Sequence, residues 1–279
     1  MYKIIKKRYF NDNAVEMTVE APLVAAACRP GQFIILRADK DGERIPLTIV
    51  GCDAERGAIT LLIQTVGYST IKLGKLCEGD EIEDLLGPLG NPTELGAFDS
   101  VLLVAGGIGS AVILPQARHI RENQAADGKK NVDIIIGGRG REFLTYETEL
   151  SQNSDNLYVM TDDGSKGGKG FVTDKIRELF DGGKKYDVVF AVGPMPMMRA
   201  VVNLTKEYGV RTLVSMNTIM VDGTGMCGGC RLTVGGETKY ACVDGPEFDG
   251  AAVDFDEAIN RAGFYKETER LHKCRFLES

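Results

Sequence analysis

Three of the seven cysteines in this 279-residue chain lie close together in a glycine-rich segment. Together with a preceding aspartate they have the spacing Asp222-x4-Cys227-x2-Cys230-x11-Cys242. A plant-type [2Fe–2S] site has the spacing Cys-x4-Cys-x2-Cys with a distant fourth cysteine, so the pattern matches if Asp222 takes the first place. Small residues beside the ligands let backbone N–H groups approach inorganic sulfide. We therefore predict a [2Fe–2S] cluster held by Asp222, Cys227, Cys230 and Cys242.

The same residues allow two other interpretations. Three cysteines and one further ligand are typical of a structural zinc site. Alternatively, Cys227 and Cys230 form a CxxC redox pair and Cys242 has no part in it. Asp244 is the competing carboxylate for the fourth ligand position. The other cysteines, at positions 28, 52, 77 and 274, are isolated in the sequence and are interpreted as core or surface thiols.

Two further segments combine glycine with hydroxyl groups in patterns that suit phosphate. Residues 104–111 predict a strand, a glycine turn and a helix start, an arrangement that binds pyrophosphate at the helix N-terminus. This turn departs from the strict G-x-G-x-x-G pattern because position 112 is valine. Gly67, Ser69 and Thr70 follow an apolar run and could hold a second phosphate at the start of another helix.

The elements that must position these residues change along the chain. The first hundred residues predict short strands separated by turns, which indicates a small antiparallel barrel. The expected strands cover 3–9, 16–20, 32–37, 47–50, 58–64 and 81–86, and the chain leaves the barrel through 88–92.

From about residue 99, short apolar runs alternate with segments of helical periodicity. The runs predict strands over 101–105, 132–136, 157–161, 188–192 and 212–215, and the intervening helices cover 110–122, 143–151, 172–180 and 196–208. This alternation is typical of a parallel sheet covered on both faces. Such sheets bind ligands at the carboxyl ends of their strands, where several glycine- and aspartate-containing turns follow.

We therefore predict a multidomain β plus α/β protein with four parts. An antiparallel β-barrel domain covers 1–97, a nucleotide-binding α/β domain with a five-stranded parallel sheet covers 98–215, and a [2Fe–2S] segment covers 216–250. The tail, 251–279, begins with an amphipathic stretch and is expected to contact a partner.

Composition excludes several classes of function. Lys and Arg number 33 against 40 Asp and Glu, a net charge of −7, which does not favour a nucleic-acid partner. No apolar run approaches the roughly 18 residues of a membrane span, and the basic start lacks the apolar core of a signal peptide. We expect no membrane association and a cytoplasmic location. The two histidines, His119 and His272, lie in a predicted helix and in the tail, so no acid–base triad is expected.

Taken together, the motifs resemble a known superfamily. Arg44, followed by Pro46-Leu47-Thr48 in the barrel, the turn Gly106-Gly107-Ile108-Gly109 and the later segment 193–198 resemble the ferredoxin–NADP reductase superfamily over residues 1–215. With the cysteine segment added, the chain resembles the electron-transfer subunits of dihydroorotate and sulfide dehydrogenases. It is most similar to the small subunits of NADH-dependent ferredoxin:NADP oxidoreductases, which use three cysteines and one aspartate at the cluster.

The resemblance implies which residues hold each cofactor. The residues implied for FAD are Arg44, Pro46, Leu47, Thr48, Ile63, Gln64, Thr65, Gly67, Ser69 and Thr70. Those implied for NAD(P) are Gly106, Gly107, Ile108, Gly109, Ser110, Arg139, Asp162, Asp163, Gly164, Gly193, Pro194 and Met195. The superfamily's arginine lies three places before the hydroxyl residue, where this chain has Ile45, and Arg44 stands one residue earlier.

The resemblance also implies a function and partners. Electrons would pass between the [2Fe–2S] cluster and NAD(H) through FAD, as part of an electron-bifurcating complex, with no catalytic side chain. The implied partner is a large subunit carrying another FAD and [4Fe–4S] clusters, and ferredoxin would be an indirect partner. Arg139 and Arg141 could bind a 2′-phosphate and favour NADP, whereas the family favours NAD. The alternatives are a subunit serving a dihydroorotate or sulfide dehydrogenase, and a non-enzymatic redox or zinc-binding module.

Overall fold

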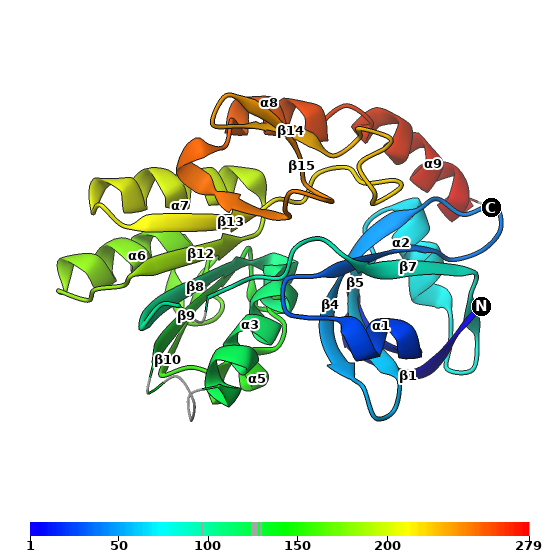
Figure 1. The fold of residues 1–279 in the computed structure, drawn as a ribbon, viewed down its shortest axis with the longest axis horizontal. Helices are drawn as coiled ribbons and strands as arrows, with labels where there is room; N and C mark the ends of the chain where they lie inside the picture. The colour runs from blue at the N-terminus through cyan, green and yellow to red at the C-terminus, as the bar shows by residue number, and fades with distance from the viewer. Residues whose placement is uncertain (96, 124–127, 129, 279) are drawn as a thin grey trace.

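A computed structural model describes residues 1–95, 97–123, 128 and 130–278. In this part of the chain two seven-stranded sheets stand side by side, and a C-terminal segment containing a small hairpin lies across both of them (Figure 1). Within the described residues, no helix is both long enough and apolar enough to cross a bilayer.

The first sheet is an antiparallel barrel with strand order β6-β1-β2-β5-β4-β3-β7. Its side chains alternate between the interior and the surface, so that Val15, Met17 and Val19 pack inside against Ile59 and Leu61. The predicted strand over 81–86 is divided in two at Glu83. The strands are β1 (Tyr2–Asn11), β2 (Ala14–Glu20), β3 (Phe33–Arg37), β4 (Ile45–Asp53), β5 (Ala58–Gln64), β6 (Glu81–Ile82) and β7 (Asp84–Leu89), with helices α1 (Pro22–Ala27) and α2 (Tyr68–Lys75) between them.

The second sheet contains the five predicted parallel strands in the order β10-β9-β8-β12-β13. Their bounds are β8 (Ser100–Gly106), β9 (Asn131–Gly138), β10 (Asn156–Thr161), β12 (Val188–Val192) and β13 (Arg211–Ser215). Two short strands lie at the edges: β11 (Gly168–Lys169) beside β10, and β16 (Glu247–Asp249), which pairs antiparallel with β13. The predicted barrel and α/β architecture is confirmed.

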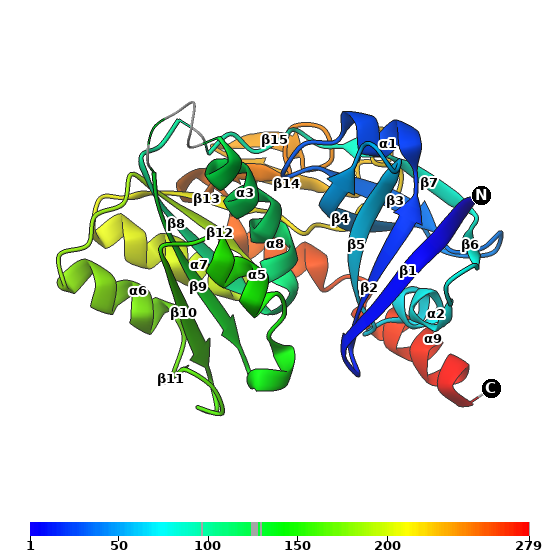
Figure 2. The ribbon, with the colours of Figure 1, turned by 90° about the horizontal axis from the view of Figure 1, so that it is seen from below.

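Helices cover both faces of this sheet, as its continuous apolar strands require. Leu103 faces α3 (Ser110–Glu122) and α5 (Glu147–Gln152), whereas its neighbours Leu102 and Val104 face the opposite way, toward α6 (Val172–Asp181) and α7 (Met195–Glu207). Figure 2 shows α3 and α5 on the side of the sheet that faces the barrel. The nucleotide-type turn therefore emerges beside the barrel.

The C-terminal segment folds onto both domains. Its hairpin, β14 (Arg231–Val234) and β15 (Glu237–Tyr240), turns at Gly235 and Gly236, whose φ angles of 60° and 81° suit a two-residue hairpin turn. After a 3-10 turn η3 (Gly250–Ala252), α8 (Phe255–Ala262) packs on α7 and β14, and α9 (Lys266–Glu278) lies beside α2. The amphipathic start of the tail thus buries Phe255 and Ala258 within this chain.

One predicted helix differs from its expected form. Instead of a helix over 143–151, the chain forms a 3-10 turn η2 (Arg141–Phe143), and α5 begins only at Glu147. Between them Tyr146 takes a left-handed conformation with φ of 58°, which cannot continue a right-handed helix. The apolar periodicity of this segment therefore comes from two short elements.

Candidate functional site

The four predicted cluster ligands form two pairs. The Sγ atoms of Cys230 and Cys242 are 3.2 Å apart and both thiols are buried. This separation exceeds the roughly 2.05 Å of a disulfide and is shorter than the ~3.8 Å between two thiolates on one tetrahedral metal ion. Cys227 is exposed and its backbone N–H donates to Asp222 Oδ2 at 2.8 Å, which places the second pair in one loop.

Backbone donors keep Asp222 anionic. The N–H groups of Thr224 and Cys227 donate to its two carboxylate oxygens and lower the pKa of this carboxyl below its usual value. A carboxylate retains further lone pairs after accepting two such bonds. Asp244, the competing carboxylate, instead accepts a hydrogen bond from the Tyr240 N–H at 2.6 Å. The contacts therefore associate Asp222 with the cysteines.

The thiols are suited to binding a metal group as thiolates. Burial, together with the neighbouring Cys230 thiol, raises the pKa of Cys242 to about 12, so proton loss there needs a cation to compensate it. The Gly229 N–H donates to Cys227 Sγ at 3.4 Å. Within the described chain the buried Thr218 hydroxyl finds no hydrogen-bond partner, and Thr218 lines a cavity together with Cys227. These donors fit a cluster whose sulfurs accept hydrogen bonds.

No three of the described His, Cys, Asp and Glu side chains are already grouped as they would be around a single metal ion. The predicted ligands instead form two separate pairs: Cys230 with Cys242, which are buried, and Asp222 with Cys227, in the exposed loop.

The cluster loop packs directly on the barrel. Gly223, which follows Asp222, has φ of 74° and lies so close to Ile35 of β3 and Leu89 of β7 that a side chain there would collide with both. Ile35 is paired across the sheet with Pro46 of β4. Directly opposed residues project from the same face of a sheet. Only one strand spacing therefore separates the cluster loop from the predicted flavin motif.

The predicted flavin residues on β4 and β5 differ in accessibility. Pro46 is exposed, and Thr48, Gln64 and Thr65 are half-buried. Leu47 is also half-buried, but it packs against the barrel core. Ile63, by contrast, is fully buried and packs in the barrel interior. The Ile63 side chain therefore packs in the barrel core and does not line a surface that a cofactor could contact.

The start of α2 provides a phosphate-type site. Gly67 is the N-cap, and the first intrahelical bond runs from the Ile71 N–H to the Gly67 carbonyl. The first turn of a helix is where phosphate binds to backbone N–H groups. Thr70 is used locally, because its Oγ1 accepts from the Val66 and Gly67 N–H groups. The Ser69 hydroxyl donates to the carboxylate of Glu43 at 2.5 Å. The sequence did not predict a role for Glu43, and the next residue, Arg44, is exposed.

The turn after β8 contains two glycines, Gly107 and Gly109, with different surroundings. Gly107 has φ of 56° and nothing within 4 Å of where a side chain would start. A side chain at Gly109 would collide with the backbone carbonyl of Val192. Ser110 is buried and its hydroxyl contacts that of Thr145. The turn thus leaves the backbone at Gly107 facing open space, while Gly109 packs against β12. A pyrophosphate site requires accessible backbone N–H groups of this kind.

The segment after β12 places a different methionine in this site from the one expected. Met195 is buried in the core. Met197, two residues further along α7, is half-buried and approaches both Gly106 and Gly193 closely. Pro194 is exposed beside it. The helical phase of α7, which the local sequence does not reveal, decides which methionine faces the turn.

Charged side chains gather at the carboxyl ends of β9 and β10. Asp162 and Asp163 are exposed and their N–H groups donate to the carbonyls of Gly138 and Arg139, which joins the two loops. Hydrogen bonds from Ser165 lower the pKa of Asp163. Arg139 and Arg141 are both exposed.

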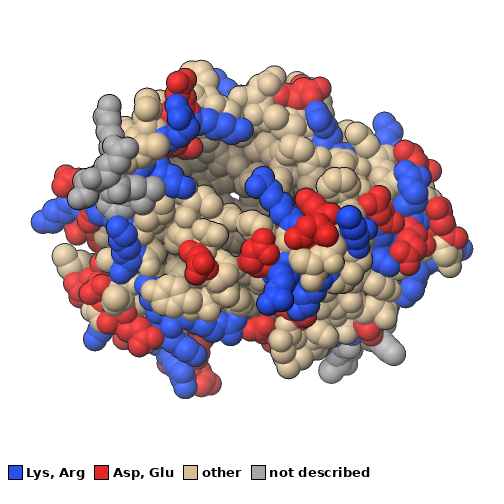
Figure 3. Space-filling view, turned by 180° about the vertical axis from the view of Figure 1, so that it is seen from behind, with Lys and Arg blue, Asp and Glu red and all other residues tan. Residues whose placement is uncertain are grey.

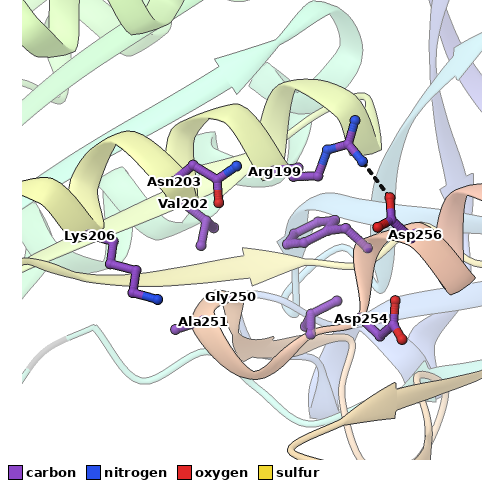
Figure 4. A pocket seen from close by; sticks show the side chains of 10 residues that line it. Arg199, Val202, Asn203, Lys206, Gly250, Ala251, Asp254 and Asp256 are labelled. Atoms are coloured by element: carbon purple, nitrogen blue, oxygen red, sulfur yellow. Dashed lines mark hydrogen bonds and ion pairs between the residues drawn. The ribbon is translucent and has the colours of Figure 1, made fainter.

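One cavity lies away from the predicted site residues, and another borders one of them. One, of about 580 Å³, lies between α7 and the start of α8; Arg199 and Asp256 form a 2.7 Å ion pair at its edge, and none of the predicted site residues line it (Figure 4). The other, of about 410 Å³, borders Cys227 and is lined by Arg231, Arg261, Phe264 and Tyr265 among others. Figure 3 shows a hollow between the two domains on the rear face, with both signs of charge interspersed around it.

Two cysteines that are isolated in the sequence come together in the fold. The Cys28 thiol, at the end of α1, lies near the Cys52 thiol on β4. This contact raises the pKa of Cys28 and lowers that of Cys52 to about 7.

Comparison with known proteins identifies two domains in the chain. Residues 217–254 match the model of the iron–sulfur cluster binding domain of dihydroorotate dehydrogenase B. Residues 103–203 match the model of the oxidoreductase NAD-binding domain. The first match contains the four predicted cluster ligands, and the second contains the glycine turn after β8.

Relatives and solved structures extend this similarity to the whole chain. A Thermotoga maritima homolog of the dihydroorotate dehydrogenase B (NAD(+)) electron transfer subunit is 43% identical over 99% of this chain and 96% of its own length. The Clostridium perfringens electron transfer subunit is 33% identical over 82% of this chain and 89% of its own length.

A chain in a structure of the NADH-dependent reduced ferredoxin–NADP oxidoreductase, solved to study flavin-based electron bifurcation, superposes with a TM-score of 0.91. It is 42% identical to this chain, and the match covers 99% of this chain and 98% of that one. A ferredoxin–NADP⁺ reductase from Neisseria gonorrhoeae, 16% identical with a TM-score of 0.60 over 75% of this chain and 90% of its own, shares the fold. The predictions of a ferredoxin-reductase fold and of an iron–sulfur, nicotinamide-dependent oxidoreductase are confirmed.

Proposed function

Because the chain belongs to the family of dihydroorotate dehydrogenase B electron-transfer subunits, we propose that it serves an NADH-dependent ferredoxin:NADP oxidoreductase. It is an iron–sulfur flavoprotein subunit that passes electrons between a [2Fe–2S] cluster and NAD(H) through FAD. The observation that carries this proposal is the packing of Gly223 on Ile35, which brings the cluster loop within one strand of the flavin motif at Pro46. Electron transfer between the two groups needs this proximity.

The side chains of this protein bind and orient, while the cofactors supply the redox chemistry. FAD accepts or donates a hydride and also exchanges single electrons, which an iron–sulfur group requires. Pro46, Thr48 and Gln64 would border the flavin ring, and the first turn of α2 with Arg44 and Ser69 would hold its phosphates. We assign no general acid or base to this chain, whose two histidines, His119 and His272, lie in α3 and α9.

The proposed nucleotide is NAD(H), held at the turn formed by residues 106–110. Asp163, kept anionic by Ser165, lies at the end of β10 where a carboxylate can accept hydrogen bonds from ribose hydroxyls. The same charge would repel the 2′-phosphate of NADP. We propose Met197 in place of Met195 as the methionine beside the nicotinamide half, because Met197 approaches Gly106.

The proposed partner is a large catalytic subunit that carries FAD and [4Fe–4S] clusters. Exposed apolar side chains surround the cluster loop, which is unusual for a surface that stays in water. They are Val221, Met226, Val243, Phe264 and Tyr265. Exposed Cys227 lies among them, and the neighbouring cavity adds the guanidinium groups of Arg231 and Arg261. In a bifurcating complex the splitting flavin would belong to the partner, so this chain alone is not expected to bifurcate electrons.

A dihydroorotate dehydrogenase partner is the second candidate, since several relatives of this chain are named for that enzyme. Asp222 in the first ligand position favours the ferredoxin:NADP oxidoreductase instead. Copurification from the native host separates the two, because the large subunits differ in size and cofactors.

An anaerobic absorption spectrum of the purified chain, titrated separately with NADH and NADPH, tests the proposal. Flavin bands on a broad iron–sulfur background, bleached by NADH at lower concentration than by NADPH, are expected. A colourless protein that contains zinc, prepared with intact cluster assembly, would overturn the electron-transfer function and favour a binding module.

A further inference from the structure

One strained residue joins the barrel to the α/β domain. Tyr146, between η2 and α5, has φ of 58° and is the one non-glycine residue with positive φ among the described residues. Side chains with a Cβ rarely adopt this conformation, and they keep it only where the surroundings over-determine it. Tyr146 is also 3% exposed, so packing and hydrogen bonds must hold it there.

Contacts on the barrel side hold the Tyr146 ring. Its hydroxyl donates to Glu16 Oε2 on β2 at 2.6 Å, and its ring meets that of Phe10 on β1 edge-on, with centroids 4.7 Å apart. The guanidinium of Arg8 lies 4.1 Å from the Phe10 ring and pairs with Glu149 of α5 at 3.1 Å. Burial and the neighbouring Glu16 raise the pKa of Tyr146, which keeps the hydroxyl protonated as a donor.

On its other side, the same residue is linked to the nucleotide turn. The preceding residue, Thr145, is buried and its hydroxyl contacts the hydroxyl of Ser110. Ser110 also donates to the Gly107 carbonyl at 3.3 Å. A continuous set of contacts therefore runs from Glu16 of the barrel through Tyr146 and Thr145 to the turn at 107–110. Figure 2 shows α5 on the side of the α/β domain that faces the barrel.

We propose that Tyr146 is a positioning residue that sets the orientation of the nucleotide turn relative to the barrel carrying the flavin motif. A hydride moves only between groups held in close and correct orientation, so a small rotation of one domain against the other slows the transfer. The hydrogen bond to Glu16 fixes the left-handed backbone at Tyr146, and that backbone places Thr145 against Ser110. This inference rests on the proposed function, which identifies the two bound groups as NAD(H) and FAD.

The test compares Tyr146→Phe with Tyr186→Phe in the full-length holoprotein. Tyr186 is the matched control, because it is buried and donates to a buried carboxylate, Asp133, at the same 2.6 Å, but within the α/β domain. We expect Tyr146→Phe to slow flavin reduction by saturating NADH about tenfold or more in stopped-flow measurements. Hydrogen exchange of the amides at 107–110 should accelerate, while FAD and iron content stay unchanged. Tyr186→Phe should lower the melting temperature and leave both other readouts at wild-type values.

A conservative change and a second pair of variants sharpen the result. Glu16→Gln keeps an acceptor for the Tyr146 hydroxyl and should stay within about twofold of the wild-type rate. If Tyr146→Phe does not fold, Thr145→Val breaks the same connection at Ser110. Its control is Thr212→Val, which removes a buried hydroxyl contact with Thr205 at 2.6 Å away from the turn.

Equal effects of Tyr146→Phe and Tyr186→Phe, or wild-type behaviour of Thr145→Val, would overturn the positioning role. Failure of the wild-type protein to bind FAD or to react with NADH would instead overturn the proposed function. The exchange rates at 107–110 would then still report whether the barrel contact orders the turn.

Discussion

Alanine substitutions at Gly107 and Gly109 should separate nucleotide binding from folding. The two glycines lie two residues apart in the same turn, but the structure gives them different surroundings. Gly107 has φ of 56° and open space on its side-chain side, whereas Gly109 packs directly on the Val192 carbonyl. Substitution of Gly107 should therefore weaken mainly nucleotide binding, whereas substitution of Gly109 should lower mainly the stability of the fold.

For Gly107→Ala, the cost to folding is the left-handed conformation alone, roughly 1–2 kcal/mol. The new methyl group, however, projects into the space where a pyrophosphate would accept backbone hydrogen bonds. Losing one such charge-assisted bond costs about 1.5–3 kcal/mol, which corresponds to roughly a 10- to 100-fold weaker nucleotide affinity. We expect the melting temperature to fall by only a few degrees.

For Gly109→Ala the expectation is reversed. Its methyl group meets the backbone of β12, which cannot move aside as a flexible side chain would, so the helix start must shift. Overpacking of this kind costs typically 1–3 kcal/mol or more. The protein should be clearly less stable than Gly107→Ala, and any loss of affinity should accompany the loss of folded protein.

Calorimetric titration with NAD⁺ and thermal melting of the holoprotein measure both quantities. FAD and iron content are recorded for each variant, so that cofactor loss is not taken for loss of affinity. Wild-type NAD⁺ affinity in Gly107→Ala would contradict the assignment of this turn as the nucleotide site. A fully stable Gly109→Ala protein would contradict the packing argument.

Three other predictions concern the cluster, the nucleotide and pH. Asp222→Cys should retain a cluster but change its EPR g values and reduction potential, since a thiolate replaces an oxygen ligand; an unchanged spectrum would show that Asp222 does not bind iron. Asp163→Ala should weaken NADH binding about tenfold through loss of a hydrogen bond to a charged group and should increase relative use of NADPH, measured as the ratio of kcat/KM values; an unchanged ratio would refute the role of Asp163. Burial raises the pKa of Glu247 to about 7, and its carboxyl is held by the Thr93 hydroxyl. Because the folded protein holds this proton more tightly, the associated stability is present below the unfolded pKa of about 4.3 and is lost as pH rises through 7. Glu247→Gln should therefore be more stable than wild type at pH 8, by up to about 3 kcal/mol, and nearly equal at pH 4.5; parallel pH–stability curves from denaturant unfolding would refute this.

Several local features of the fold could be predicted because they depend on spacing along the chain. The alternation in β2 and the continuous apolar runs of β8 and β12 identify the two kinds of sheet, since burial on one or both faces leaves a different pattern. A two-residue glycine turn also marks the hairpin at Gly235-Gly236, a signal that was present but not used.

Other features required the folded chain. The choice of Met197 over Met195 depends on the rotation of α7 against β8. The contact of Glu43 with Ser69 and that of Cys28 with Cys52 join residues 26 and 24 positions apart. No local pattern encodes such contacts, because they follow from how complete elements pack.

The sequence by itself predicted the chemistry proposed for this protein, from a ligand set with cluster spacing, a glycine turn before a helix, and a flavin-type motif on a barrel strand. These signals are short because neighbouring residues in one loop act on one group. The tertiary structure alone decided how the three sites are joined. Gly223 meets Ile35, and Tyr146 meets Glu16, although the two residues of each pair are more than a hundred positions apart. Their proximity results from packing one domain on another, which local spacing does not record.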